Sequence, residues 1–154
     1  MKKTCIIISA VIFVLFILMP GESFAQRGPR KGGWGGWGPG TAYGRLYNPQ
    51  TVETLSGEVV KVEKFSLGRG ISQGIHLLLK TEKETIPVHL GPAWYIDNQE
   101  VKIAPKDRIE VKGSRITYDG KPAIIAAEIK KDDQVLKLRD ENGYPVWSGW
   151  RRVR

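Results

Sequence analysis

Apolar and polar side chains alternate along much of the chain after residue 51, which indicates short β-strands. The alternation runs through residues 75–81, 84–90, 107–118 and 122–130, and a period of two is typical of strands with one buried face. No long stretch carries the 3.6-residue repeat of an amphipathic helix. The pattern therefore predicts an all-β domain and excludes a helical bundle or a doubly wound sheet.

Two of the predicted strands change phase midway. Residues 55–59 alternate in one phase and residues 60–62 in the other, while Gly113 and Ser114 interrupt a second strand. A bulge or bend at such a point lets one long strand serve both sides of a closed barrel. A helix-start signal precedes residues 93–98, so the order is three strands, a short helix and two strands. This order predicts a five-stranded OB-fold-like barrel with one short helix between strands 3 and 4.

The N-terminal residues carry the three-part pattern of a secretory signal peptide. A basic start at residues 1–3 precedes an apolar run from Cys5 to Met19, and Ser23-Phe24-Ala25 fits the small-x-small cleavage rule. The run is shorter than the about 20 apolar residues that a transmembrane helix needs. We therefore expect a signal peptide at residues 1–25 and a periplasmic mature protein, with an uncleaved inner-membrane anchor as the less favoured alternative.

Composition divides the rest of the chain into a Gly/Pro-rich flexible leader at residues 26–50, an OB-like barrel domain at 51–140 and an aromatic, basic C-terminal tail at 141–154. The first half of the leader offers too little apolar surface to offset its ordering entropy. Within it, Trp34 and Trp37 either dock on the barrel or on a partner, or stay exposed. Tyr43, Leu46 and Tyr47 are expected to begin packing on the domain.

Charge and cysteine content limit the cofactors and partners. The formal net charge of +8 favours an envelope partner such as an acidic protein, a small anion or a membrane surface. Nucleic acid is not expected, because export separates the protein from it. The one cysteine, Cys5, lies in the signal peptide, which excludes disulfides, iron–sulfur clusters and c-type haem attached through Cys-x-x-Cys-His. No nucleophile constellation is evident, and we expect a protein that is not an enzyme.

The predicted register brings the two histidines of the chain together. If Glu82-Lys83 is a two-residue turn, His76 and His89 are direct cross-strand partners on the outer face, with Cβ atoms about 4.5–5.5 Å apart. Two imidazoles at this separation can share a transition metal ion. A third ligand is missing locally, although Glu58, Glu63 or the Gly-rich loop can supply one. The alternative is a pair of structural histidines that stack or form hydrogen bonds.

Other candidate ligand-binding residues lie in the loop at residues 66–74 and in the short helix. Arg69 of that loop is placed to contact an anion, although a plain mobile loop is the simpler interpretation. Trp94 and Tyr95 are expected to cover the end of the barrel and only secondarily to line a pocket.

Aromatic and basic residues also alternate in the tail, where the candidates for anion or partner binding are Trp147, Trp150, Arg151 and Arg152. Such interleaving suits base stacking or an acidic lipid surface. In the alternative, Trp147 folds back onto the barrel and the arginines remain solvated. Just before the tail, Arg139 and Asp140 are expected to form a local ion pair.

Two motifs resemble the domain of the MamS/MamX magnetosome proteins. One is Val88-His89-Leu90-Gly91-Pro92-Ala93-Trp94-Tyr95, and the other runs from Leu138-Arg139-Asp140 through Gly143 and Pro145 to Trp147. The resemblance implies a periplasmic or membrane-associated accessory role with links to iron and redox handling. The chain departs from the haem-bearing members because it has no Cys-x-x-Cys-His, so neither haem binding nor electron transfer is carried over.

These features together predict an exported periplasmic binding or accessory module of the cell envelope. A transition-metal-binding protein that uses the cross-strand histidine pair is the first alternative, and a nucleic-acid-binding OB protein is the second.

Overall fold

The structure, a computed structural model, describes residues 35–149. The predicted signal peptide, the first part of the leader and the tail residues Trp150, Arg151 and Arg152 lie outside the described residues. Within the described range, the helices are all too short to span a membrane.

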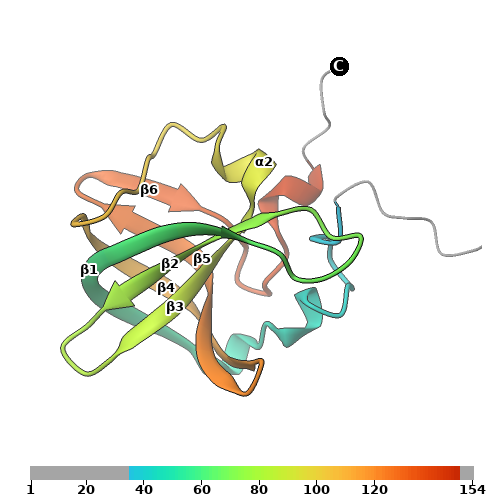
Figure 1. Cartoon of the computed structure of the whole chain (residues 1–154), viewed down its shortest axis with the longest axis horizontal. Helices are drawn as coiled ribbons and strands as arrows, with labels where there is room; N and C mark the ends of the chain where they lie inside the picture. Colours follow the sequence, from blue (N-terminus) through green and yellow to red (C-terminus); the bar gives the residue numbers. More distant parts are fainter. Residues whose placement is uncertain (1–34, 150–154) are drawn as a thin grey trace, which may run out of the picture. The chain divides into compact units, whose positions relative to one another are not determined.

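The described chain forms a closed β-barrel. Its strands are β1 (Val52–Phe65), β2 (Gly74–Lys80), β3 (Thr85–Pro92), β4 (Arg108–Tyr118), β5 (Lys121–Lys131) and β6 (Gln134–Lys137). Their order in the sheet is β3-β2-β1-β4-β5-β6, and a parallel pairing of β3 with β5 closes the first five into a ring (Figure 1). The short helix α2 (Ala93–Ile96) lies between β3 and β4 in the chain. The predicted five-stranded OB-fold-like barrel is therefore confirmed, with β6 as a further short strand beside β5.

Bulges occur where the alternation changes phase. In β1 the register against β2 shifts between Val59 and Lys61, which leaves Val60 48% exposed. The first half of β1 pairs mainly with β4 and the second half with β2, so the bulge marks the corner of the barrel. At Gly113 the register of β4 against β5 also shifts, and a Cβ atom there would lie 2.4 Å from the carbonyl oxygen of Ile125.

The barrel interior contains the apolar residues that the alternation selected, among them the fully buried Val59, Leu77, Leu79, Val88, Val111 and Ile129.

The hairpin turns also form where the sequence predicts them. The Thr81 N–H donates to the Glu84 carbonyl at 2.8 Å, and Asp119 and Gly120 have φ values of 50° and 72°, both positive as a type I′ turn requires.

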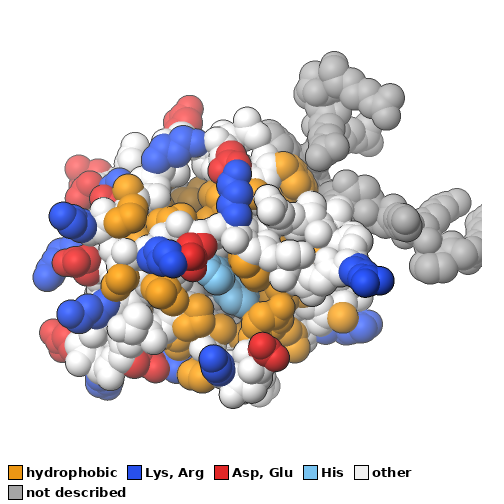
Figure 2. All heavy atoms as spheres, in the orientation of Figure 1, with side chains coloured by type: hydrophobic (Ala, Val, Ile, Leu, Met, Phe, Trp, Pro, Cys, Tyr) orange, Lys and Arg blue, Asp and Glu red, His pale blue; other side chains and the backbone are white. Residues whose placement is uncertain are grey.

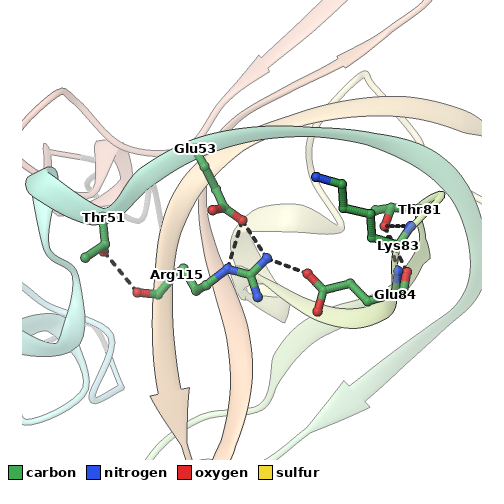
Figure 3. A network of polar contacts seen from close by, with 6 residues as sticks. All are labelled: Thr51, Glu53, Thr81, Lys83, Glu84 and Arg115. Carbon is green, nitrogen blue, oxygen red and sulfur yellow. Dashed lines mark hydrogen bonds and ion pairs between the residues drawn. The ribbon is translucent and has the colours of Figure 1, made fainter.

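Arg115 of β4 ties the β2–β3 hairpin to the start of β1. Its Nη2 atom donates to Glu53 at 2.7 Å and to Glu84 at 2.5 Å, and its Nε atom donates to Glu53 at 2.9 Å (Figure 3). The guanidinium thus lies between a carboxylate of β1 and one of the β2–β3 turn. This arrangement raises the pKa of Arg115 and lowers the pKa of Glu84.

The two ends of the described chain pack against each other and against the barrel (Figure 1). The indole N–H of Trp147, in the 3-10 turn η3 (Val146–Gly149), donates to the carbonyl oxygen of Trp37 at 2.9 Å. Trp37, Tyr43 and Tyr47 are buried, whereas Leu46 is 38% exposed in the turn η1 (Gly44–Leu46), which η2 (Pro49–Thr51) follows. Tyr43 and Tyr47 thus pack on the domain as expected, and Trp37 docks there as well, because these aromatic side chains supply apolar contacts that the Gly-rich composition conceals.

Candidate functional site

The two histidines lie side by side on the outer surface of β2 and β3. His76 and His89 are register partners, as the two-residue turn predicted, and their ring centroids are 5.9 Å apart with an interplanar angle of 22°. Phe65, at the end of β1, packs against both rings; its ring centroid lies 4.7 Å from that of His76 and 4.8 Å from that of His89. Half-buried Leu78 and Pro87 form the next outward-facing pair. We call Phe65, His76, Leu78, Pro87 and His89 the histidine face. In Figure 2, hydrophobic side chains border the pale blue histidine atoms, and charged side chains adjoin them on one side.

The burial of the two imidazoles differs. The His76 side chain is 21% exposed, and its Nε2 atom lies 3.4 Å from Oε2 of Glu63. His89 is only 2% exposed, because Tyr43 and Tyr118 cover it. The sequence placed both rings on the outer face of the barrel, and both lie there. It gave no sign that the segment before β1 folds back over that face and covers His89.

Burial also determines the charge of His89. Desolvation, followed by the positive potentials of His76 and Arg139, lowers the His89 pKa to about 4, so the ring is neutral at physiological pH. Burial raises the pKa of Tyr43, whose hydroxyl shares a 2.9 Å hydrogen bond with Nδ1 of His89. A neutral imidazole is the form that binds a metal ion.

The histidine pair does not form a complete set of protein ligands. Within residues 35–149, no three side chains of His, Cys, Asp or Glu are placed to hold a metal ion together. Glu63 is next to His76 but is also paired with Lys61 at 2.5 Å, and Glu58 is the register partner of Lys80 at the other end of β2. At this point the described residues supply two imidazoles and no third ligand of these types.

The loop between β1 and β2 follows Phe65 directly and so borders the histidine face. Arg69 is exposed in this loop. The loop also contains the letters Gly-x-Ser-x-Gly around Ser72, a match that the sequence reading missed. This serine precedes a strand rather than a helix, and its hydroxyl donates to the carbonyl oxygen of Gly35 at 3.4 Å, so the geometry is not that of a nucleophile elbow.

The aromatic residues of α2 cover the barrel. Tyr95 is 9% exposed and its ring lies 5.5 Å from that of Trp147, while half-buried Trp94 packs against the core. Trp147 is fully buried, so its proposed role as an exposed stacking group is wrong, and the fold-back alternative describes its position.

Sequence reasoning missed the environment of Arg139. The expected ion pair with Asp140 is absent from the described residues. Arg139 is instead buried, at 5% exposure, and its Nη1 atom donates to the carbonyl oxygens of Leu90 and Ala126. The Cζ atom of its guanidinium lies 4.8 Å from the centroid of the Trp147 ring. Asp140 accepts the backbone N–H groups of Asn142 and Tyr144. In the sequence, the only indication that Arg139 is important was its position in the motif that begins at Leu138.

The fold and these surfaces define a small five-stranded barrel protein of the OB type, with an aromatic and imidazole face outside the barrel. The chain belongs to the MamS/MamX magnetosome protein family, whose model matches residues 51–136. The search of curated proteins found no match.

Proposed function

We propose that the protein is a non-catalytic accessory module of the cell envelope that binds a partner on its histidine face. The observation that carries this proposal is the position of the face, on β2 and β3 next to the β1–β2 loop, where OB barrels commonly bind their ligands. The exposed part of His76 and the half-buried Leu78 and Pro87 offer an apolar and hydrogen-bonding surface. Family membership supports an accessory role, and the signal-peptide pattern supports export.

Cell fractionation tests the location. The mature protein is expected in the periplasmic fraction of its own host, with mass spectrometry showing an N-terminus at Gln26. Recovery of the full-length chain from the cytoplasm would contradict export.

Site-specific photo-crosslinking in the host tests the binding face. A photoreactive residue at Leu78 is expected to form a light-dependent adduct, and the same residue at Val135, which is 52% exposed on β6, serves as the control. Equal adducts at both positions, or none at Leu78, would remove the histidine face from the proposal.

A second candidate function is transition-metal binding, which the register of His76 with His89 and the neutral His89 ring favour. The test titrates Zn²⁺ and Cu²⁺ separately into the mature protein by calorimetry. His76→Ala should abolish one-to-one uptake of the metal ion, and Glu63→Gln should weaken it. The control is Glu110, whose carboxylate pairs with Lys130; Glu110→Gln should leave uptake unchanged. Unchanged uptake by His76→Ala would eliminate this function.

A further inference from the structure

We propose that a pocket around Arg139 binds a small organic carboxylate. The pocket has a volume of about 170 Å³ and lies between residues 37–47 and residues 139–147, with Tyr43, Tyr47, Arg139 and Trp147 in its walls. We call it the Arg139 pocket. It is a different site from the histidine face, although Tyr43, which lines the pocket, also forms a hydrogen bond with His89 of that face.

The guanidinium of Arg139 has no counter-ion among the described residues. No carboxylate of residues 35–149 forms an ion pair with it, and the adjacent Asp140 is occupied by two backbone N–H groups. Burying an unpaired charge is costly, and a bound anion offsets that cost. The pocket therefore contains a positive charge that a ligand can neutralise.

The unused donors of Arg139 remain accessible. Its Nη1 atom donates to both carbonyl oxygens, whereas Nε and Nη2 have no hydrogen bond within the described residues. In the described residues every fully buried side-chain nitrogen or oxygen atom has a partner, so these two nitrogens cannot be fully buried. Arg139 lines the pocket, and we assign both nitrogens to it, since Nε and Nη2 form the fork that binds a carboxylate through two parallel hydrogen bonds.

The remaining walls indicate the rest of the ligand. Trp37, Pro39, Ile125, Pro145 and Trp147 give the pocket an apolar lining. A volume of about 170 Å³ is comparable to that of an engineered cavity, about 150 Å³, that holds benzene. Burial raises the pKa of Tyr47, so its hydroxyl stays protonated and able to donate. These features fit a carboxylate attached to a compact apolar body.

Binding of a ligand in the Arg139 pocket should also change the pKa of His89. The charge of Arg139 is one of the causes that lower the His89 pKa, and a bound carboxylate would offset this charge. The His89 pKa is therefore expected to rise on binding, although the ring does not line the pocket. This is a readout that does not depend on identifying the natural ligand.

The test uses benzoate as the probe and benzamide, its neutral analogue of the same shape, as the control, each titrated into the mature protein. Benzoate should bind one-to-one by calorimetry, shift the NMR signal of the Arg139 Nε–H group and raise the His89 pKa. Benzamide should bind about tenfold more weakly or worse, because it lacks the charge. Equal affinity for benzoate and benzamide, or no binding of benzoate, would overturn the proposal. Equal affinity for inorganic phosphate would overturn the assignment to a carboxylate.

Variants that leave Arg139 in place avoid unfolding the barrel. Asn142 lines the pocket at an exposed position, so Asn142→Glu adds a negative charge there and should weaken benzoate binding several-fold. Gln134→Glu makes the same change of charge at an exposed position of β6 outside the pocket and should leave the affinity unchanged. Tyr47→Phe should weaken binding through the loss of one donor. Equal effects of Asn142→Glu and Gln134→Glu would show that only net charge matters and would refute the pocket.

Discussion

The hydroxyl group of Tyr43 lies 2.9 Å from Nδ1 of His89, although the two residues are 46 positions apart. This contact joins the segment before β1 to the outer surface of β3. It turns a histidine that would otherwise face solvent into a buried, neutral one, and leaves His76 as the exposed member of the pair.

Replacing Tyr43 by Phe should destabilise the protein by about 1–2 kcal/mol, because the change leaves a buried imidazole nitrogen without its partner. Urea denaturation of the variant and the wild type measures the difference. Tyr144→Phe, at a tyrosine that is 52% exposed, is the control and should have little effect. Equal stabilities of Tyr43→Phe and the wild type would mean that the hydrogen bond contributes nothing.

Stability should fall as the pH drops from about 6.5 to about 4. The folded-state pKa of His89 is lowered from 6.5 to about 4, so the unfolded chain binds the proton first and protonation favours unfolding. The stabilisation is complete above pH 6.5 and is lost toward pH 4, by up to about 3 kcal/mol. Denaturation across this range should show a smaller slope for His89→Gln, and NMR titration of the wild-type ring should give a midpoint near 4. A midpoint near 6.5 would contradict the burial of His89.

Trp147→Ala should cost about 3–5 kcal/mol, because it removes a fully buried indole together with its hydrogen bond to Trp37. The neighbouring Val146→Ala, at a side chain that is 37% exposed, should cost far less. Thermal and urea unfolding of both variants make the comparison. Similar costs would show that residues 146–149 are not part of the folded core.

Arg115→Gln should cost about 1 kcal/mol, because the guanidinium bridges Glu53 and Glu84 with three hydrogen bonds. Lys130→Gln breaks a single exposed ion pair with Glu110 at 3.5 Å and should cost less than about 0.5 kcal/mol. The difference between the variants should shrink in high salt, which screens both. The reverse order of stabilities would contradict the bridging role of Arg115.

Local patterns predicted the barrel because strand faces and hairpin turns are short-range properties. The turn at Glu82-Lys83 was enough to place His76 opposite His89, and the phase change near Val60 was enough to predict the bulge. The MamS/MamX resemblance also came from two short motifs, and the family match confirms it.

By itself, the sequence determined which side chains of β2 and β3 face the interior, since alternation and turn chemistry act over a few residues. Only the tertiary structure decided that His89 is buried, that Trp147 belongs to the core and that Arg139 lines a pocket without a counter-ion. The first outcome requires the segment before β1 to fold over β3, and the other two require that segment to meet the segment after β6, as Trp37 and Trp147 do across 110 positions. A contact of this range depends on the apolar surface that the folded barrel presents to both segments, and no local pattern encodes that surface.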